Sequence, residues 1–233
     1  NYSPTLNYSR TINKGKTLSV GYSGNNSSPS ASQLQPIRNT QNLQNIVIGN
    51  PNLKPSFNHR LNANYNYIEE KSGASLFFSV NFSTTQNEII NNVILIPDTL
   101  NSLKQETRYE NTNGTYSIGS NYSINIPIKK NKFSFSYGGN FGISNRAVFI
   151  NNEKNFNKGI NFSQNLRASA SAKNFSASAN ANYSFSSNNN FYNQGMIGGD
   201  ILLGNLGQVS GATFLRTHNY RASVEGRYNN KNF

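Results

Sequence analysis

Few residues in this chain combine the types and the spacing that catalysis or metal binding requires. The two histidines, His59 and His218, lie far apart, and neither has a nearby Asp, Glu or Cys at the spacing of a metal site or a nucleophile. The adjacent carboxylates Glu69 and Glu70 precede a lysine, and we expect them to be solvated in a tight turn. The glycine-rich segment 195–207 lacks the Lys and the Ser or Thr of a phosphate-binding loop. We therefore expect no enzyme, no cofactor and no metal site.

Five charged residues are better candidates for a binding role, because each falls on the polar face of an alternating segment. They are Arg60, Arg167, Arg221, Glu225 and Arg227. Charged side chains on a polar, solvated face of a sheet tune what that face binds, and we expect this role for all five. The alternative for the last three is a structural role. Arg221, Glu225 and Arg227 are close in sequence, and they would then only pair with one another. The elements that carry these residues decide between the two roles.

Nine segments of the chain alternate between apolar and polar residues with a period of two, as β-strands do. In the third segment, Ala63 and Tyr65 fall on one face, while Asn62 and Asn64 fall on the other. Most segments exceed the five or six residues usual for strands in soluble proteins and suit the roughly 9–11 residues of a membrane-spanning strand. The nine segments are 2–12, 18–23, 57–67, 76–82, 116–128, 133–143, 156–170, 175–185 and 220–228.

The connections between these segments alternate between short and long. Because antiparallel strands reverse direction at each connection, all short turns must lie at one end and all long loops at the other. An up-and-down transmembrane β-barrel has this arrangement, with short periplasmic turns and longer extracellular loops. We therefore predict an all-β, antiparallel barrel segment of about 9–10 strands. Its short turns are expected at 13–16, 69–73, 129–132, 173–174 and 229–232, and its long loops at about 24–55, 85–113, 145–155 and 186–213.

The composition favours a barrel over the main alternative, a soluble β-sandwich. Only 35% of the residues are hydrophobic and 13% are charged, so the positions opposite the apolar ones are mainly Asn, Ser and Gly. A sandwich would bury its apolar face and use Greek-key connections, whereas a small, uncharged polar face suits a water-filled lumen. Charge avoids the apolar face, with Arg10 and Arg216 as exceptions. The lack of cysteine excludes disulfides and thiolate ligands.

The net charge of +12 comes largely from lysines in the expected short turns. These residues form one basic end of the barrel, which meets anionic headgroups or is simply solvated. No basic and aromatic recognition module accompanies them, so we expect no nucleic-acid partner. The turn lysines are Lys14, Lys16, Lys71, Lys129, Lys130, Lys132, Lys173 and Lys231.

One loop segment resembles a motif of a known family. The chain reads G-N-P-N-L-K-P directly before the third strand, and TonB-dependent outer-membrane receptors carry a similar stretch at this place. Ser56 follows it, where that family usually has an acidic residue. The segment 109–114, which precedes another long strand, extends the resemblance, and the Asn-rich strands look most like those of the Bacteroidetes-type outer-membrane β-barrels. The motif residues are Gly49, Asn50, Pro51, Asn52, Leu53, Lys54 and Pro55.

The resemblance implies a location and a function. The location is the bacterial outer membrane, with lipid and lipopolysaccharide around the barrel, and the function is uptake of a scarce ligand without chemistry on it. It also implies a barrel of about 22 strands, an N-terminal plug, a TonB-type energy transducer that acts through the plug, and a surface lipoprotein as an optional lid. We expect residues 1–233 to be a single partial barrel domain from the later part of such a barrel, without the plug.

Other functions stay open from the residues alone. A structural or adhesive barrel, or a secretion pore without a plug, would use the same strands. An outer-membrane enzyme barrel would need a cluster of Ser, His and an acidic residue, which the sequence does not supply. The wall also does not identify the ligand, because receptors for siderophores, oligosaccharides, peptides and vitamins share it.

Overall fold

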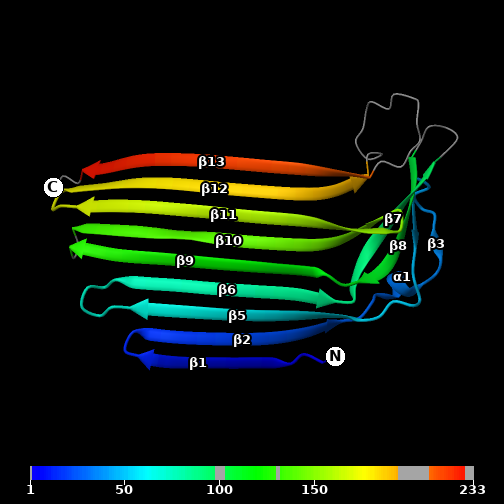
Figure 1. Ribbon diagram of the computed structural model, residues 1–233, viewed down its shortest axis with the longest axis horizontal. Helices are drawn as coiled ribbons and strands as arrows, with labels where there is room; N and C mark the ends of the chain where they lie inside the picture. Colours follow the sequence, from blue (N-terminus) through cyan, green and yellow to red (C-terminus); the bar gives the residue numbers. More distant parts are fainter. Residues whose placement is uncertain (1, 98–102, 130–131, 194–209, 229–233) are drawn as a thin grey trace, which may run out of the picture.

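A computed structural model of the chain describes residues 2–97, 103–129, 132–193 and 210–228. Nine long strands form a continuous wall, and each pairs antiparallel with the next along it. All nine expected strands and the all-β, up-and-down architecture are thereby confirmed (Figure 1). The wall strands are β1 (Thr5–Asn13), β2 (Lys16–Ser27), β5 (Ser56–Ile68), β6 (Ser75–Gln86), β9 (Thr115–Lys129), β10 (Phe133–Ile150), β11 (Glu153–Ser171), β12 (Phe175–Asn193) and β13 (Ser210–Tyr228).

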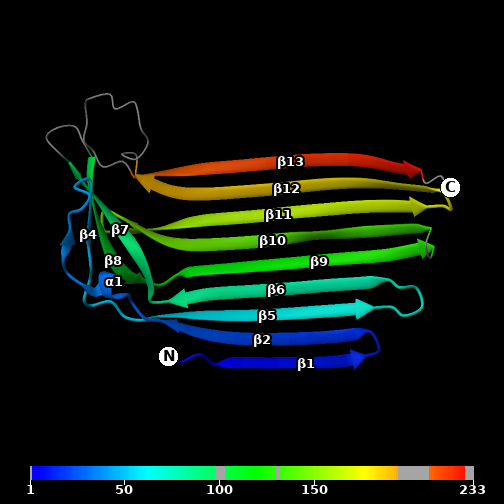
Figure 2. The ribbon, with the colours of Figure 1, turned by 180° about the vertical axis from the view of Figure 1, so that it is seen from behind.

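The wall is an open sheet within the described residues. β1 pairs only with β2, β13 pairs only with β12, and the two lie at opposite edges (Figures 1 and 2). An open edge leaves a row of unpaired N–H and C=O groups, and in hydrocarbon each such group costs several kcal/mol. The nine strands therefore form a segment of a barrel wall.

The pairing register assigns each wall residue to one of two faces, because directly opposed residues on neighbouring strands point to the same side. Leu18 lies opposite Tyr65, and Tyr65 lies opposite Phe78. The apolar residues thus continue from strand to strand on one face, which we call the outer face. The residues between them are mainly Asn, Ser and Gly and form the inner face, on which Asn62 lies opposite Asn81.

The outer face carries an apolar band of nearly constant height. On β5 the first outward residue past the short turn is Tyr67, and Phe57 lies ten residues further along. Ten residues of strand span about 34 Å, and a tilt of about 45° reduces this to about 24 Å, close to the ~25 Å band of outer-membrane barrels. The same interval on the later strands joins Ile128 to Ile118, Phe133 to Ile143, Ala170 to Ile160, Phe175 to Phe185 and Tyr228 to His218.

The wall has almost no dry core. Among the described residues the buried apolar side chains are Leu53, Ile90 and Ala147, and all three lie at the loop end. On the outer face, in contrast, Phe78 is 43% exposed and Val224 is 82% exposed. So large an apolar surface needs a partner, and in a membrane barrel that partner is lipid.

Both histidines lie near the edge of the outer band that is closer to the loop end of the wall. The Nδ1 atom of His59 is 2.9 Å from the hydroxyl of Tyr22, and that of His218 is 3.1 Å from the hydroxyl of Tyr183. Phe57 also packs against the His59 ring, with centroids 4.6 Å apart. Rings that are apolar on one side and polar at the tip favour the membrane–water interface, so the environment of His59 suits that interface.

The two long loops 24–55 and 85–113 contain regular structure, which corrects the expectation of simple loops. β8 pairs antiparallel with β7 and in parallel with β4, and β7 joins the end of β10 at Phe149 and Ile150. Together these elements form what we call the loop cap, at the loop end of the wall (Figures 1 and 2). The loop cap consists of α1 (Ala31–Leu34), β3 (Arg38–Asn39), β4 (Asn45–Ile48), β7 (Glu88–Pro97) and β8 (Leu103–Thr112).

Two further loop predictions were too long. In place of a loop over 145–155, β10 and β11 continue to a two-residue turn at Asn151 and Asn152, whose φ angles are 51° and 66°. Asn tolerates positive φ better than most residues, and such turns match the twist of a hairpin. In place of a loop over 186–213, β12 runs to Asn193 and β13 starts at Ser210, and residues 194–209 lie outside the described part.

The short turns are where the alternation places them. The turn at 13–16 uses Gly15 with φ of 75°, and the turn at 69–73 uses Gly73 with φ of 76°. The turn at 173–174 also joins adjacent strands, and all three lie at the end of the wall opposite the loop cap (Figure 1). The turn at 229–232 and part of the turn at 129–132 lie outside the described residues. No helix in the described part of the chain has the length and apolar character needed to cross a membrane.

Candidate functional site

The register places the five candidate charged residues on the inner face. Arg60 lies opposite Ser23 and Ser83, on the two strands that flank β5. Arg167 in the same way lies opposite Ser136 on β10. Their side chains therefore project among hydroxyl and amide groups, away from the apolar band.

The three charged residues of β13 share this face. Arg221 lies opposite Asn182, and Glu225 lies opposite Ser178. Arg227 occupies the next inner position beyond Glu225. Within the described residues no ion pair joins Glu225 to either arginine, so the structure does not show the pairing that the sequence left open.

The five residues do not form one cluster. Arg60 is on β5, whereas Arg221 is on β13, and the strands β6, β9, β10, β11 and β12 lie between them. At about 4.8 Å per strand, the two side chains start almost 30 Å apart along the sheet. The charged residues are thus spread around the inner face.

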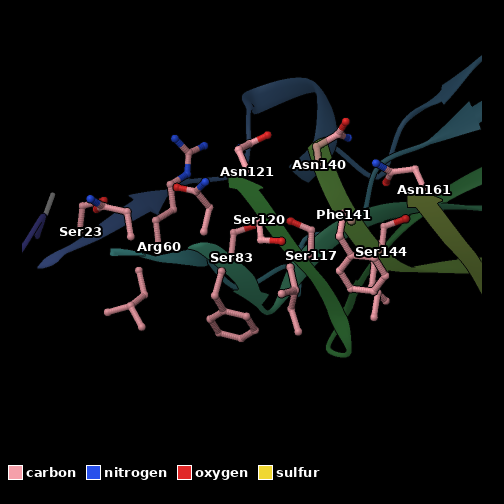
Figure 3. Close-up of a pocket in the computed structure, with 18 residues that line it drawn as sticks. Ser23, Arg60, Ser83, Ser117, Ser120, Asn121, Asn140, Phe141, Ser144 and Asn161 are labelled. Atoms are coloured by element: carbon pink, nitrogen blue, oxygen red, sulfur yellow. Dashed lines mark hydrogen bonds between the residues drawn. The ribbon is translucent and has the colours of Figure 1, made fainter. Parts of the chain in front are cut away.

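The inner face is hollowed around Arg60. An open hollow of about 690 Å³ reaches across six strands, from β2 to β11, and Arg60 is the one charged residue that lines it. In Figure 3 the side chains of Arg60, Asn121, Asn140 and Asn161 project on one side of the sheet, and the ring of Phe141 lies on the other. The hollow therefore presents amide and hydroxyl groups and a single guanidinium.

Small residues keep this hollow open. A Cβ atom at Gly119 would meet open space, with no atom within 4 Å. A Cβ atom at Gly142 would instead overlap the amide of Asn161 on the neighbouring strand. Glycine here leaves room for the amide beside it.

The Arg60 guanidinium is oriented by Asn58, whose Oδ1 accepts a hydrogen bond of 3.0 Å from Nε.

The motif Gly49 to Pro55 docks against β8. The Asn50 side chain donates to the backbone carbonyl of Tyr109 at 2.9 Å. The Asn111 carboxamide bonds Lys54 twice, since Oδ1 accepts from its N–H at 2.7 Å and Nδ2 donates to its carbonyl at 2.9 Å. The two segments that carry the family resemblance, 49–55 and 109–114, are thus in direct contact.

Three residues of the motif, Gly49, Asn50 and Leu53, are also held by close packing or a backbone hydrogen bond. A Cβ atom at Gly49 would overlap the carbonyl oxygen of Gln35, so only glycine allows this approach. The next residue, Asn50, donates its backbone N–H to the carbonyl of Gln33 at 2.6 Å. Leu53 is 8% exposed and packs inward. The motif therefore fixes the path of the chain from the loop cap into β5.

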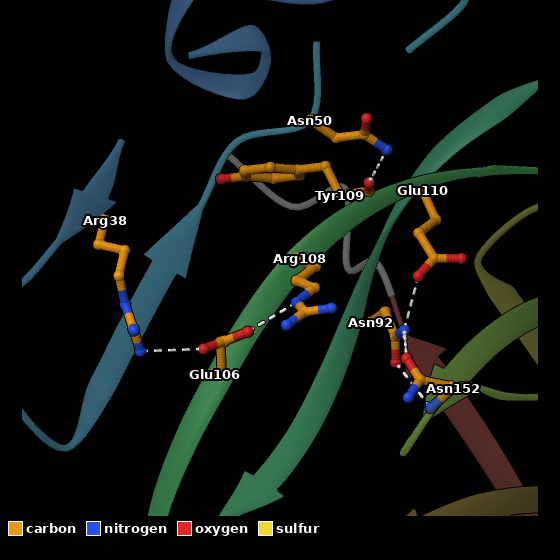
Figure 4. Close-up of polar contacts among 8 residues, drawn as sticks. All are labelled: Arg38, Asn50, Asn92, Glu106, Arg108, Tyr109, Glu110 and Asn152. Carbon is orange, nitrogen blue, oxygen red and sulfur yellow. Dashed lines mark hydrogen bonds and ion pairs between the residues drawn. The ribbon is translucent and has the colours of Figure 1, made fainter. Parts of the chain in front are cut away.

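A buried carboxylate holds the loop cap together. The side chain of Glu106 is 7% exposed and lies 3.2 Å from Nη2 of Arg38 and 2.6 Å from Nε of Arg108 (Figure 4). Burial of a carboxylate is costly unless it is paired and hydrogen-bonded, and both oxygens have a partner here. The pair between Arg38 and Glu106 ties β3 to β8.

A buried amide joins the loop cap to the wall. Asn92 on β7 is fully buried, and its Nδ2 donates to Glu110 and to Asn152 at 2.7 Å each. Its Oδ1 accepts from the backbone N–H of Asn152 at 3.2 Å. Asn151 adds a hydrogen bond of 3.0 Å from the N–H of Leu95. The turn between β10 and β11 therefore anchors the loop cap to the wall (Figure 4).

A second open hollow of about 500 Å³ lies between the motif and β8. Arg108, Tyr109 and Glu110 line it from β8, and Ile48 and Pro51 line it from the other side. It combines a cation, a carboxylate and an aromatic ring at the loop end of the molecule. These groups can contact a polar solute through hydrogen bonds and opposite charge.

Sequence reasoning missed Glu106, Arg38 and Asn92. In each pair the partners are far apart in the chain, for example 68 residues for Arg38 and Glu106, and no local pattern marks such pairs. The apolar residues from Ile89 to Ile96 were a usable signal for β7, but they surround two asparagines and do not alternate strictly. Among the described residues no group of three His, Cys, Asp or Glu could hold a metal ion.

The open antiparallel wall, its lipid-facing band and its polar inner face define the class of protein, a segment of a transmembrane β-barrel. Within this class the chain belongs to the outer membrane protein beta-barrel family, whose model matches residues 1–203. It therefore belongs to the bacterial outer membrane, as the resemblance implied.

A solved structure has the same fold. The siderophore receptor PirA from Pseudomonas aeruginosa is similar over 97% of this chain, with a TM-score of 0.51 and 14% sequence identity. The chain spans 42% of the length of that receptor. No curated protein matches the chain. At this identity the likeness concerns the fold alone.

Proposed function

We propose that this chain forms part of the wall and mouth of a TonB-dependent receptor, which takes up a scarce ligand through the outer membrane without chemistry on it. The observation that carries this proposal is the hollow of about 690 Å³ on the inner face, lined by amides, hydroxyls and Arg60. Such a surface holds a hydrated solute through exchangeable hydrogen bonds. The family, and a fold like that of a siderophore receptor, support the proposal.

In this proposal the loop cap meets the ligand first, at the hollow beside Arg108 and Tyr109. The ligand then passes along the inner face, where the arginines on β5, β11 and β13 tune selectivity. A plug and its contact with the energy transducer are supplied by residues beyond this chain. A surface lipoprotein is an optional partner that would close the mouth, and the Asn-rich wall favours a Bacteroidetes-type barrel of about 22 strands.

The experiment compares a gated receptor with an open pore. The full-length protein is reconstituted in a planar lipid bilayer, and the ionic current is recorded without added ligand. We expect no steady conductance, because a plugged receptor is closed at rest. A stable, ohmic channel would contradict the proposal and favour the secretion pore or the plugless structural barrel.

Uptake in the host bacterium provides the second arm. Cells with and without the TonB-type transducer receive a panel of siderophores loaded with radioactive iron and a panel of labelled oligosaccharides. We expect one probe whose uptake disappears both on deletion of this gene and on deletion of the transducer. Gene-dependent uptake that persists without the transducer would show passive diffusion.

A further inference from the structure

Two opposite charges lie on one face of β8 without pairing. Arg108 and Glu110 are two residues apart on this strand, so their side chains project from the same face, about 7 Å apart at the backbone. Both residues line the hollow of about 500 Å³ beside the motif. Among the described residues, no ion pair joins the two side chains. The hollow therefore contains a cation and an anion that stay apart.

A buried carboxylate keeps the Arg108 side chain away from Glu110. Glu106 lies on the same face of β8, two residues before Arg108, and accepts a hydrogen bond of 2.6 Å from its Nε atom. Glu110 lies two residues after Arg108, in the opposite direction along the strand. The two Nη atoms of Arg108 donate to no other described residue. They can therefore bind a second carboxylate, from a solute, in the two-bond geometry that a guanidinium favours.

A buried amide holds Glu110 in a similar way. Asn92, which is fully buried on the neighbouring strand β7, donates from Nδ2 to Oε1 of Glu110 at 2.7 Å. The same amide is bonded to Asn152, so its position is fixed by the wall (Figure 4). Oε2 of Glu110 accepts no hydrogen bond from the described part of the chain. One carboxylate oxygen therefore stays available for a cation from solution.

These two charges favour a zwitterion over a simple anion or cation. Arg108 attracts a carboxylate, but Glu110 repels it, and the reverse holds for an ammonium group. A solute that carries both groups meets the opposite charge at each end. In a single amino acid the two groups are attached to one carbon atom, whereas two linked residues span about 7 Å. The spacing of Arg108 and Glu110 along β8 therefore suits a peptide.

We propose that this hollow binds the two charged ends of a short peptide, with the carboxylate on Arg108 and the ammonium group on Glu110. This inference names the ligand class of the proposed receptor and rests on that function. The volume of about 500 Å³ lies within the range of roughly 300–1,000 Å³ for small-molecule pockets. Ile48, Pro51 and Tyr109 line the same hollow and offer apolar contacts to the side chains of the peptide.

The experiment measures peptide binding by the full-length protein in an uncharged detergent, where neither the transducer nor transport is needed. The probe is radiolabelled dialanine in equilibrium dialysis. N-acetyldialanine, which lacks the ammonium group, and dialanine amide, which lacks the carboxylate, are the matched probes.

The variants neutralise one charge of the hollow at a time. They are Arg108→Gln and Glu110→Gln, and the second keeps an oxygen that accepts from Asn92. The control is Glu153→Gln with Lys158→Gln, which removes one charge of each sign from exposed positions on β11. Heat-modifiable migration on a gel verifies that each variant is folded.

We expect the native protein to bind dialanine about tenfold more tightly than either blocked probe. Arg108→Gln should lose the preference for dialanine over its amide, because the carboxylate then has no partner. Glu110→Gln should lose the preference for dialanine over N-acetyldialanine for the corresponding reason. The control should bind all three probes as the native protein does.

Three results would overturn the proposal. They are the absence of saturable dialanine binding, equal binding of the three probes by the native protein, and a control that loses the same preferences as the two variants. A variant in the hollow that keeps both preferences would overturn it as well. Failure of the proposed function is distinguishable from these results, because a steady conductance without ligand contradicts gated uptake, whereas the dialysis requires no transport.

Discussion

Asparagine has three different structural roles in this chain. On the inner face, residues such as Asn121 line the hollow with an uncharged amide. In the turn after β10, Asn151 and Asn152 adopt positive φ. In the loop cap, Asn92 and Asn111 use both ends of the carboxamide to join segments far apart in sequence. An amide is both donor and acceptor without charge, which explains why one residue type suits all three places.

Replacement of Asn111 by Asp should loosen the motif at 49–55. Asn111→Asp keeps the acceptor for the Lys54 N–H, but it removes the Nδ2 donations to the carbonyls of Lys54 and Asn87. It also sets a carboxylate against two carbonyl oxygens, and we expect a local loss of about 1–3 kcal/mol. Hydrogen exchange of residues 49–55 should become faster by one to two orders of magnitude.

The control for this prediction is Asn91→Asp, because Asn91 is exposed on β7. It introduces the same charge close by in sequence and should leave exchange of 49–55 unchanged. Equal exchange rates in the two variants would show that the Asn111 carboxamide does not hold the motif.

At the residue scale the sequence predicted which face of the sheet a side chain lies on, but not which residues it contacts. Alternation alone assigned Arg60, Arg167 and the charged residues of β13 to the polar face, and the register agrees. Alternation could not predict the ion pair of Glu106 with Arg38, because the two residues are brought together only by the parallel pairing of β4 with β8. Local patterns carry no information about such distant contacts.

At the scale of elements, the wall strands extend well beyond the membrane at the loop end. β10, β11 and β12 are 18, 19 and 19 residues long, whereas about 9–11 residues cross the bilayer. The excess carries the wall out to the loop cap, where β7 pairs with Phe149 and Ile150 of β10. The extension therefore provides the support on which the cap is built.

The turn at Asn151 and Asn152 permits a test that separates backbone from side-chain effects. A Gly-Gly turn keeps the positive φ and the backbone N–H that donates to Asn92, but it loses the side-chain hydrogen bonds with Asn92 and Leu95. An Ala-Ala turn loses the same side-chain hydrogen bonds and adds roughly 1–2 kcal/mol of backbone strain per residue. We expect cap stability to decrease from the native turn to Gly-Gly to Ala-Ala. The measurement is hydrogen exchange of the β7 amides.

Exchange at the opposite end of the wall, around Gly15, serves as the internal reference and should not change. Identical β7 exchange in the native and Gly-Gly proteins would mean that the side chains of Asn151 and Asn152 do not anchor the cap.

The same elements explain which boundaries could be predicted. Strand existence followed from period two, since the alternation is continuous within the membrane, where one face must be apolar and the other polar. Strand ends did not, because above the membrane both faces meet water or the cap and the alternation fades, as in the Ser186–Asn190 stretch of β12. The β7–β8 hairpin was missed for the same reason.

At the scale of the whole molecule, the arrangement is inverted relative to a soluble globule. Apolar residues lie outside in contact with lipid, uncharged polar residues lie inside, and the buried apolar side chains of the described part are confined to the loop end. This explains how a chain with 35% hydrophobic residues and 13% charged residues forms long strands without a dry core. The fold class was thus predictable from composition and alternation together, whereas the cap that covers the loop end was not.

The most direct test of this inside-out arrangement is a spin-label scan along β12. The chain contains no cysteine, so single cysteines can be placed in turn at positions 175–187 of the full-length protein in a lipid bilayer. We predict that odd positions, such as Ala179 and Ala181, collide mainly with lipid-soluble oxygen, and that even positions, such as Ser178 and Asn180, collide mainly with a water-soluble nickel chelate. Accessibility that does not alternate, or that alternates in the opposite phase, would contradict the account.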